Sequence, residues 1–277
     1  MLLEPMLVLP FFQLFFTLIF SMFPVLFHIY GFEIHTYPVF VLLGVLLSSW
    51  YIIRLCSQNR LMLQFINDNL FTFSFGVFAF SRIGGILESW STYSQNPLLI
   101  FNIFDASYNF YAGVLGFILM VFLAAFRKKE AFWKWLDVLS RSFLLFFIIL
   151  SLADFSAGKN YGIPTELPWA VSVSIPEVRY TIPVHPVQIY EFLLLTALFA
   201  FLTLKSRKKQ YEGVITSYAF FGFFSIQAFI ILFQGAPDFV IFGMKFGLLA
   251  SLFAAGVFLV MLIIHTHPNK HWFHHDH

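Results

Sequence analysis

The chain has little charge and almost no cysteine. Only 11% of its 277 residues are charged, whereas 60% are hydrophobic and the mean hydropathy is +0.82. A soluble domain of this length needs far more charged surface, so the composition indicates a polytopic membrane protein instead. The single cysteine, Cys56, excludes an internal disulfide. It lies beside Arg54 in an expected cytoplasmic loop, which favours a bystander thiol.

Several catalytic signatures are also missing. The sequence contains no P-loop, no zinc-ligand spacing, no paired catalytic carboxylates and no G-x-S-x-G elbow. Without an internal repeat or a charged pair in mid-membrane, a transporter finds little support. Lys and Arg occur in short clusters at the ends of apolar runs, a pattern of membrane topology rather than of nucleic-acid binding. We therefore expect an integral membrane protein with no nucleic-acid partner, no metal and no cofactor.

Seven apolar segments are long enough, or nearly so, to span a bilayer, which takes about 20 mostly apolar residues. They are residues 36–54, 69–87, 109–126, 139–157, 189–205, 212–234 and 246–264. The sequence therefore predicts an all-α polytopic membrane protein with seven core transmembrane helices, in a transmembrane core of residues 23–265.

The two ends of the chain lie outside the seven-segment core and differ from it in composition. An extra hydrophobic segment, residues 1–22, belongs to an apolar run at 7–27 that is compatible with an eighth helix, an interfacial helix or an uncleaved signal-like segment. It lacks a basic start and a small-residue cleavage site, so we do not expect a removed signal peptide. Residues 266–277 form a His-rich cytoplasmic tail, which could bind metal but more simply is incidental.

Basic residues set the expected orientation. They follow the first, third, fifth and seventh segments: Arg54, Arg60, Arg127, Lys128, Lys129, Lys134, Lys205, Arg207, Lys208, Lys209 and Lys270. By the positive-inside rule these loops and the C-terminus are cytoplasmic. The loop of about 158–188 then faces the periplasm. Its five prolines exclude a long helix and favour a small folded loop region or short strands.

Polar side chains gather near the outer ends of the predicted helices. They are His35, Tyr37, Arg82, Glu88, Asp105, Asp154, Lys159, His185, Gln188, Tyr190 and Glu191. An ionisable group in hydrocarbon costs at least about 2.5 kcal/mol, so such groups usually face a cavity or mark a functional site. Their convergence predicts a polar cavity open to the lipid and the periplasm.

Structural explanations exist for some of these residues. Arg82 and Glu88 could simply hold helices together, and Asp105 could cap a helix. His35 and Tyr37 could be interfacial anchors. The segment at 185–191 is harder to explain in this way, because its glutamine and glutamate are three residues apart and share one face of a membrane helix.

Five short motifs occur in the order in which they occur in one bacterial enzyme family. They are His35 with Tyr37, Ser81–Gly84, Phe104–Gly116, His185–Glu191 and Gln234–Asp238. The most specific, His185-Pro186-Val187-Gln188-Ile189-Tyr190-Glu191, is similar to H-P-S-Q-L-Y-E. Over residues 23–264 the chain thus resembles the prolipoprotein diacylglyceryl transferases, which transfer diacylglyceryl from phosphatidylglycerol to the lipobox cysteine of a preprolipoprotein. The resemblance implies the bacterial inner (cytoplasmic) membrane, a site facing the periplasm, and phospholipid and lipoproteins as partners.

Several positions depart from the family pattern in residues that this reaction needs. Tyr111 stands where the family has its catalytic histidine, and a tyrosine, with an ordinary pKa of about 10, is a poor base at neutral pH. Ser151 stands where an arginine is expected, and Asp154 replaces an asparagine. Gln227 and Ile231 lie near a second arginine and a glutamate of the family. A cavity that has lost two guanidinium groups and gained a carboxylate suits an anionic head group less well.

Two functions follow from these observations. The substitutions favour a non-catalytic relative that binds phospholipid or lipoprotein at the periplasmic leaflet, as a binding or assembly subunit of an envelope complex. The alternative is an active phospholipid-dependent transferase that modifies the lipobox cysteine, with a donor that is zwitterionic or otherwise unlike phosphatidylglycerol. The proton-handling candidates would then be Tyr111, His185 and Glu191. The lipid-binding or substrate-binding candidates are His35, Tyr37, Arg82, Asp105, Asp154, Lys159, Gln188 and Tyr190.

Overall fold

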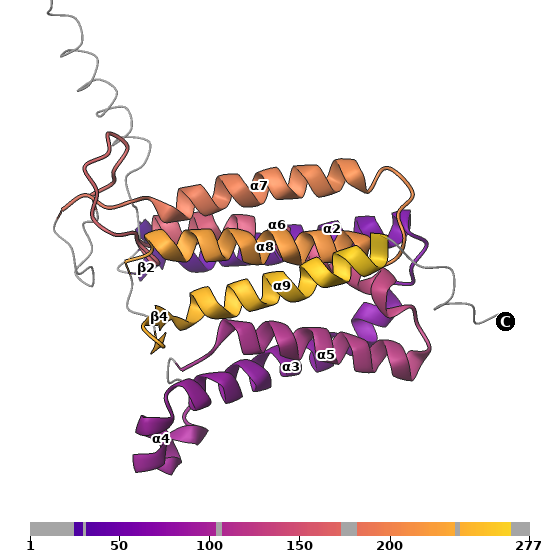
Figure 1. Cartoon of the computed structure of the whole chain (residues 1–277), viewed down its shortest axis with the longest axis horizontal. Helices are drawn as coiled ribbons and strands as arrows, with labels where there is room; N and C mark the ends of the chain where they lie inside the picture. Colours follow the sequence, from indigo (N-terminus) through magenta and orange to yellow (C-terminus); the bar gives the residue numbers. More distant parts are fainter. Residues whose placement is uncertain (1–24, 30–31, 104–106, 173–181, 236–238, 267–277) are drawn as a thin grey trace, which may run out of the picture. The chain divides into compact units, whose positions relative to one another are not determined.

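Seven long apolar helices dominate the computed structural model, which describes residues 25–29, 32–103, 107–172, 182–235 and 239–266 (Figure 1). Each is long and apolar enough to cross a membrane, which confirms the predicted all-α, seven-span architecture. They are α2 (Thr36–Gln58), α3 (Gln64–Glu88), α5 (Phe110–Lys128), α6 (Phe132–Ser156), α7 (Val187–Lys205), α8 (Val214–Phe233) and α9 (Phe246–Thr266). A helix satisfies its own backbone hydrogen bonds, as hydrocarbon requires.

Some helix boundaries differ from those predicted. Helices α3 and α6 begin at Gln64 and Phe132, earlier than the expected residues 69 and 139. Their first two turns contain charged residues, such as Asp68 and Asp137, which lower the hydropathy of these turns but are compatible with helical hydrogen bonding. The expected loop position of Cys56 was also wrong, because this residue is buried within α2.

Short elements fill the connections. Strands β1 (Val25–Ile29) and β2 (Phe32–His35) form an antiparallel hairpin before α2, so the end of the apolar run at 7–27 is a strand. Strands β3 (Val240–Ile241) and β4 (Met244–Lys245) form a second hairpin between α8 and α9. Helix α4 (Trp90–Gln95) and the 3₁₀ helix η1 (Pro97–Phe101) follow α3. Residues 1–22 lie outside the described residues, as does the tail from residue 267.

The larger of two compact units comprises the described residues of Met1–Tyr51 and Ser140–His277. Within it, α8 packs against both α7 and α9 (Figure 1). Aromatic rings fill its core: Phe143 of α6 lies 5.0 Å from Phe223 of α8, and Phe220 lies 4.9 Å from Phe258 of α9, between ring centroids. Such aromatic contacts fix the positions of the helices whose ends form the site described below.

The smaller unit, Ile52–Leu139, is built on the packing of α3 against α5 (Figure 1). The two backbones approach closely at glycines. A Cβ atom on Gly116 would lie only 2.5 Å from both the carbonyl oxygen of Gly76 and the Cβ of Phe80. Small residues permit this approach between membrane helices, where packing rather than the hydrophobic effect drives association.

Gly116→Ala should therefore destabilise the protein, by about 1–3 kcal/mol for an overpacked contact. The matched control is Gly256→Ala in α9, where an added Cβ meets nothing within 4 Å. This control should be neutral or slightly stabilising, because alanine is the better helix former by up to about 1 kcal/mol. Apparent melting temperatures in detergent measure both effects. Equal melting temperatures for the two variants would contradict the close α3–α5 approach.

Candidate functional site

The end of α6 folds back on itself through a glycine. The amide of Gly158 donates to the carbonyl of Phe155 at 3.1 Å, and that of Lys159 donates to the carbonyl of Asp154 at 2.9 Å. Gly158 has a φ of +64°. These two bonds and the left-handed residue form a Schellman motif, in which glycine is the usual residue at that position. The reversal returns the chain past the last turn of α6, so that residues 159 and 160 lie near Asp154.

A group of side chains at this end of the larger unit forms what we call the polar cluster. Its members are Tyr37, Ser151, Asp154, Lys159, Asn160, Gln188, Glu191 and Gln227, from α2, α6, α7, α8 and the loop after α6. Asp154 is buried, and its Oδ2 accepts a hydrogen bond from Nδ2 of Asn160 at 2.9 Å. The Nζ of Lys159 lies 3.7 Å from the centre of the Tyr37 ring. This cation–π contact holds the ammonium close to the carboxylate of Asp154, with which it interacts electrostatically.

Helix α7 contributes the second carboxylate of the polar cluster. The Nε2 of Gln227, 36 residues away on α8, donates to Oε1 of Glu191 at 2.5 Å. The Ser151 hydroxyl donates to the Phe147 carbonyl at 2.9 Å and lies within hydrogen-bonding reach of Glu191. Asp154 is close enough to act electrostatically on Glu191. Two carboxylates thus share this cluster with one ammonium group.

One buried acceptor in the polar cluster has no donor. Gln188 is only 1% exposed, and its Nε2 donates to the carbonyl oxygen of Lys159. Its Oε1 accepts from no group in the part of the chain that the structure describes. Leaving a buried acceptor unsatisfied costs about 1–3 kcal/mol. A donor from a bound molecule would remove that cost.

A second group of polar residues precedes and opens α7. The Tyr190 hydroxyl accepts a hydrogen bond from Nε1 of Trp169 at 2.8 Å and lies 3.2 Å from Nδ1 of His185. The hydroxyl oxygen has a second lone pair, so it can also accept from the Nδ1–H of neutral His185, which leaves Nε2 free to accept a proton. Burial lowers the pKa of His185 below its ordinary value of 6.5, which favours this neutral form.

Backbone pairing holds His185 in place. Its amide donates to the carbonyl of Ile163 at 3.0 Å, and its carbonyl accepts from the amide of Gly162 at 3.1 Å. A Cβ on Gly162 would collide with the His185 backbone, so glycine is required at this position. Isolated bridges join Val184 to Pro164 and Val171. These bridges agree with the expected short strands, while residues 173–181 of the same loop lie outside the described residues.

Lys245 borders the polar cluster and was not among the predicted site residues. Its Nζ donates to the carbonyl of Gln234 at 2.5 Å and to that of Ile231 at 3.3 Å. A cation is favourable beside the carbonyl groups at the C-terminal end of a helix such as α8. The Gln234 side chain donates in turn to Oδ1 of Asn160 at 3.3 Å. Lys245 is the single basic residue between the two apolar segments that form α8 and α9, and this was the sequence signal that could have identified it.

In the smaller unit, Arg82 is buried and organises the chain after α4. Its guanidinium nitrogens donate to four backbone carbonyls, those of Leu99, Ile100, Asn102 and Ser107, at 2.9–3.3 Å. The rings of Tyr93 and Tyr108 lie 5.3 and 5.4 Å from its Cζ. This arrangement favours the structural explanation for Arg82, and its contact with phosphate stays a prediction.

The remaining predicted residues have varied settings. Tyr111 lies in the first turn of α5, with its ring 5.3 Å from that of Phe110. Asn109 is the N-cap of α5, accepting from the amide of Ala112 at 2.9 Å and donating to Glu88 at 3.1 Å. Asp105 lies outside the described residues. His35 is exposed at the end of β2, and its site role stays a prediction.

Comparisons with known proteins agree with one another. The family model for prolipoprotein diacylglyceryl transferase matches residues 24–264. The phosphatidylglycerol-prolipoprotein diacylglyceryl transferase of Geobacter sulfurreducens is 29% identical over 241 residues, which cover 85% of this chain and 89% of that protein. Proteins of the same name from Campylobacter lari (29% identical; 85% and 91% covered) and Pseudomonas fluorescens (30% identical; 74% and 78% covered) are similar to it as well.

Proposed function

The chain belongs to the prolipoprotein diacylglyceryl transferase family, and from this premise we propose that it is an active phospholipid-dependent transferase that modifies the lipobox cysteine of prolipoproteins. The carrying observation is the polar cluster, in which the family-like segment His185–Glu191 is folded against the end of α6 and the side chain of Gln227. Relatives that share most of this chain's length are named as such transferases, which supports activity over the non-catalytic function that the substitutions favoured.

The proposed reaction forms one bond and breaks one. The cysteine sulfur attacks the glycerol carbon of the phospholipid, a C–S bond forms, and the C–O bond to the phosphate breaks. The thiol must first lose its proton, and its ordinary pKa is about 8.5. We assign the proton to His185, which burial keeps neutral and which Tyr190 holds at Nδ1. Lys159 would stabilise the departing phosphate.

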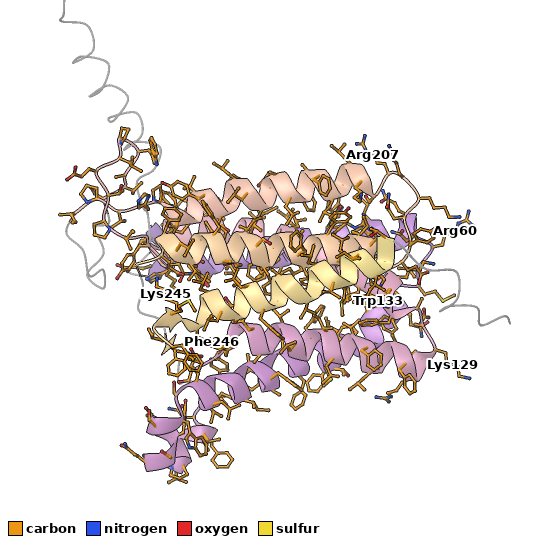
Figure 2. All side chains as sticks on the ribbon, in the orientation of Figure 1. Arg60, Lys129, Trp133, Arg207, Lys245 and Phe246 are labelled. Atoms are coloured by element: carbon orange, nitrogen blue, oxygen red, sulfur yellow. The ribbon has the colours of Figure 1, made fainter. Side chains whose placement is uncertain are left out.

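The proposed orientation places the polar cluster at the periplasmic leaflet of the bacterial inner membrane. Lys245, beside the cluster, and Arg207, in the basic α7–α8 loop, lie at opposite ends of the larger unit (Figure 2). The positive-inside rule assigns the Arg207 end to the cytoplasm, along with the end of α9. Lipid head groups of the outer leaflet would then reach the cluster.

Transfer activity should decline as the pH falls below about 6.5, the ordinary histidine pKa. Because the pKa of His185 is lowered, the folded protein binds this proton more weakly than the unfolded chain does. The neutral base therefore persists to somewhat below pH 6.5, and both activity and the stability of the His185 segment are lost on further acidification. A rate profile between pH 5 and 8 with a lipobox peptide measures this. A profile without an acid limb would contradict His185 as the base.

The non-catalytic function keeps one specific observation in its favour. Ser151 and Gln227 occupy positions where the family resemblance predicts arginine. Here Ser151 donates to the carbonyl of Phe147, and Gln227 donates to Glu191. A binding subunit would keep the polar cluster but would need no general base. It would not modify a lipobox cysteine with any phospholipid as the donor.

Complementation distinguishes the two functions. The protein is expressed in a bacterium depleted of its own diacylglyceryl transferase, and lipoprotein processing is followed by gel and mass spectrometry. We expect diacylglyceryl-modified lipoprotein from the unaltered chain and from Glu166→Gln, which changes an exposed carboxylate outside the cluster. His185→Ala should fail at equal membrane expression. Failure of the unaltered chain, both in cells and with purified protein, would favour the binding subunit.

A further inference from the structure

The β3–β4 hairpin between α8 and α9 has an unusual turn. Ile241 of β3 pairs with Met244 of β4. The loop between them therefore has two residues, Phe242 and Gly243, with φ angles of +52° and +77°. A two-residue loop with positive φ at both positions is a type I′ turn, which favours asparagine or aspartate followed by glycine. Gly243 meets this preference, whereas a bulky side chain such as that of Phe242 is strained in the left-handed region.

Burial of the Phe242 side chain does not offset this strain. The side chain is 95% exposed, more than any other large hydrophobic side chain in the part of the chain that the structure describes. A residue held in a strained backbone conformation persists where its surroundings or its function require it. Because the fold leaves the ring exposed, the requirement for phenylalanine points to a partner outside the described residues.

Neighbouring side chains extend the apolar surface around Phe242. Phe239, Val240 and Met244 are all exposed. From Phe239 to the start of α9, Lys245 is the single charged residue, and its ammonium donates to two backbone carbonyls at the end of α8. The tip of the hairpin therefore presents apolar side chains and no charge. An exposed apolar surface of this kind marks a contact with a protein or a membrane.

The place of the hairpin in the fold favours the membrane. It joins α8 directly to α9, and both helices are long and apolar enough to span a bilayer. Strand β4 lies at the same end of the larger unit as β2 (Figure 1). Helix α9 itself exposes large apolar side chains such as Leu252 and Phe253, as a spanning helix does towards lipid. The apolar hairpin therefore continues a chain segment that already faces lipid, and it lies where that segment leaves the bilayer.

We propose that the β3–β4 hairpin binds the lipid surface next to the polar cluster, with the Phe242 ring inserted at the boundary between head groups and acyl chains. The base of the hairpin connects this contact to the cluster. Lys245 donates to the carbonyl of Gln234, whose side chain donates to Asn160. The hairpin thereby sets the depth of this end of α8 relative to the lipid. The inference does not depend on catalysis, so it holds equally for a transferase and for a binding subunit.

A depth measurement tests the proposal. The native thiol, Cys56, is buried, so the full chain with Phe242→Cys carries one accessible thiol for a nitroxide label. The labelled protein is placed in nanodiscs of phosphatidylcholine and phosphatidylglycerol. We expect the label to collide more with oxygen than with a water-soluble nickel chelate, at a depth of about 5–10 Å within the head-group and acyl boundary. The matched control, Lys209→Cys in the exposed α7–α8 loop, should show the reverse order. The unaltered chain gives the labelling background.

Three outcomes would overturn the proposal. A label at position 242 that collides more with the nickel chelate lies in water. A label that neither reagent reaches is covered by protein, either another segment of this chain or a second copy. A label that lies in water and becomes shielded only after a lipobox peptide is added would assign the hairpin to peptide binding instead.

A second test asks whether insertion depends on the Phe242 ring itself. Phe242→Asn supplies the residue that a type I′ turn prefers, so the apparent melting temperature in detergent should be unchanged or higher. In nanodiscs, a nitroxide at the exposed position of Val240→Cys should then move outwards, which lowers the ratio of oxygen to nickel collisions. Phe242→Trp should preserve this ratio, because tryptophan also suits the membrane interface. An unchanged ratio in Phe242→Asn would contradict the lipid contact. A lower melting temperature in Phe242→Asn would show that the ring stabilises the fold, and would also contradict the proposal.

Discussion

His185→Ala should lower the rate of diacylglyceryl transfer by about 10²–10⁴-fold, the usual contribution of a positioned general base. His185 is held in place through both its backbone and its imidazole ring. Its carbonyl and amide pair with Gly162 and Ile163, and Nδ1 lies 3.2 Å from the Tyr190 hydroxyl. Replacement by alanine keeps the backbone pairing and removes the proton acceptor. The rate constant at saturating lipid, measured with a lipobox peptide, should therefore fall while lipid retention is preserved.

Two further variants show whether a loss of activity in His185→Ala comes from the loss of the base itself. Tyr190→Phe removes the hydroxyl that orients the imidazole, and its effect should be smaller than that of His185→Ala because the base itself is retained. Glu166→Ala, in the same loop but exposed, should have no effect. If His185→Ala were fully active with an unchanged pH profile, the base would have to be sought elsewhere, with Glu191 the first residue to replace.

Arg82→Ala should destabilise the protein by about 3 kcal/mol, because it removes a buried charge that serves several hydrogen-bond acceptors at once. The four carbonyls that accept from Arg82 lie in η1 and the segment that leads to α5. Without the guanidinium they lose their common donor. Arg82→Lys keeps the charge but cannot span the four acceptors, so its loss should be intermediate.

The Arg82 prediction is measured by thermal unfolding and limited proteolysis in detergent. Cleavage should appear first in residues 96–103. Arg207→Ala is the matched control, since this arginine is exposed in the α7–α8 loop. A stable Arg82→Ala variant that has lost only lipid binding would show that Arg82 acts on the phosphate directly, as the sequence first suggested.

Much of the candidate site was predictable at the level of segments. The motif at 185–191 indicated that Gln188 and Glu191 share a face of a helix, and both side chains belong to the polar cluster. Gln227 was noticed only as a substituted position, and its pairing with Glu191 was not foreseen. Asn160 and Lys245 were missed altogether. Their roles depend on the reversal at Gly158 and on the carbonyls at the end of α8, and neither has a signature in hydropathy.

The sequence by itself determined the class of the protein, its seven spans and its family-like segments. It could do so because hydrocarbon admits only chains that satisfy their own backbone hydrogen bonds, which makes each span a local property. The tertiary structure alone decided what each polar side chain does. Arg82 serves backbone carbonyls 17 to 25 residues away, and Glu191 meets a glutamine on another helix. These partnerships arise from helix packing and chain reversal, which bring together residues that no local pattern connects.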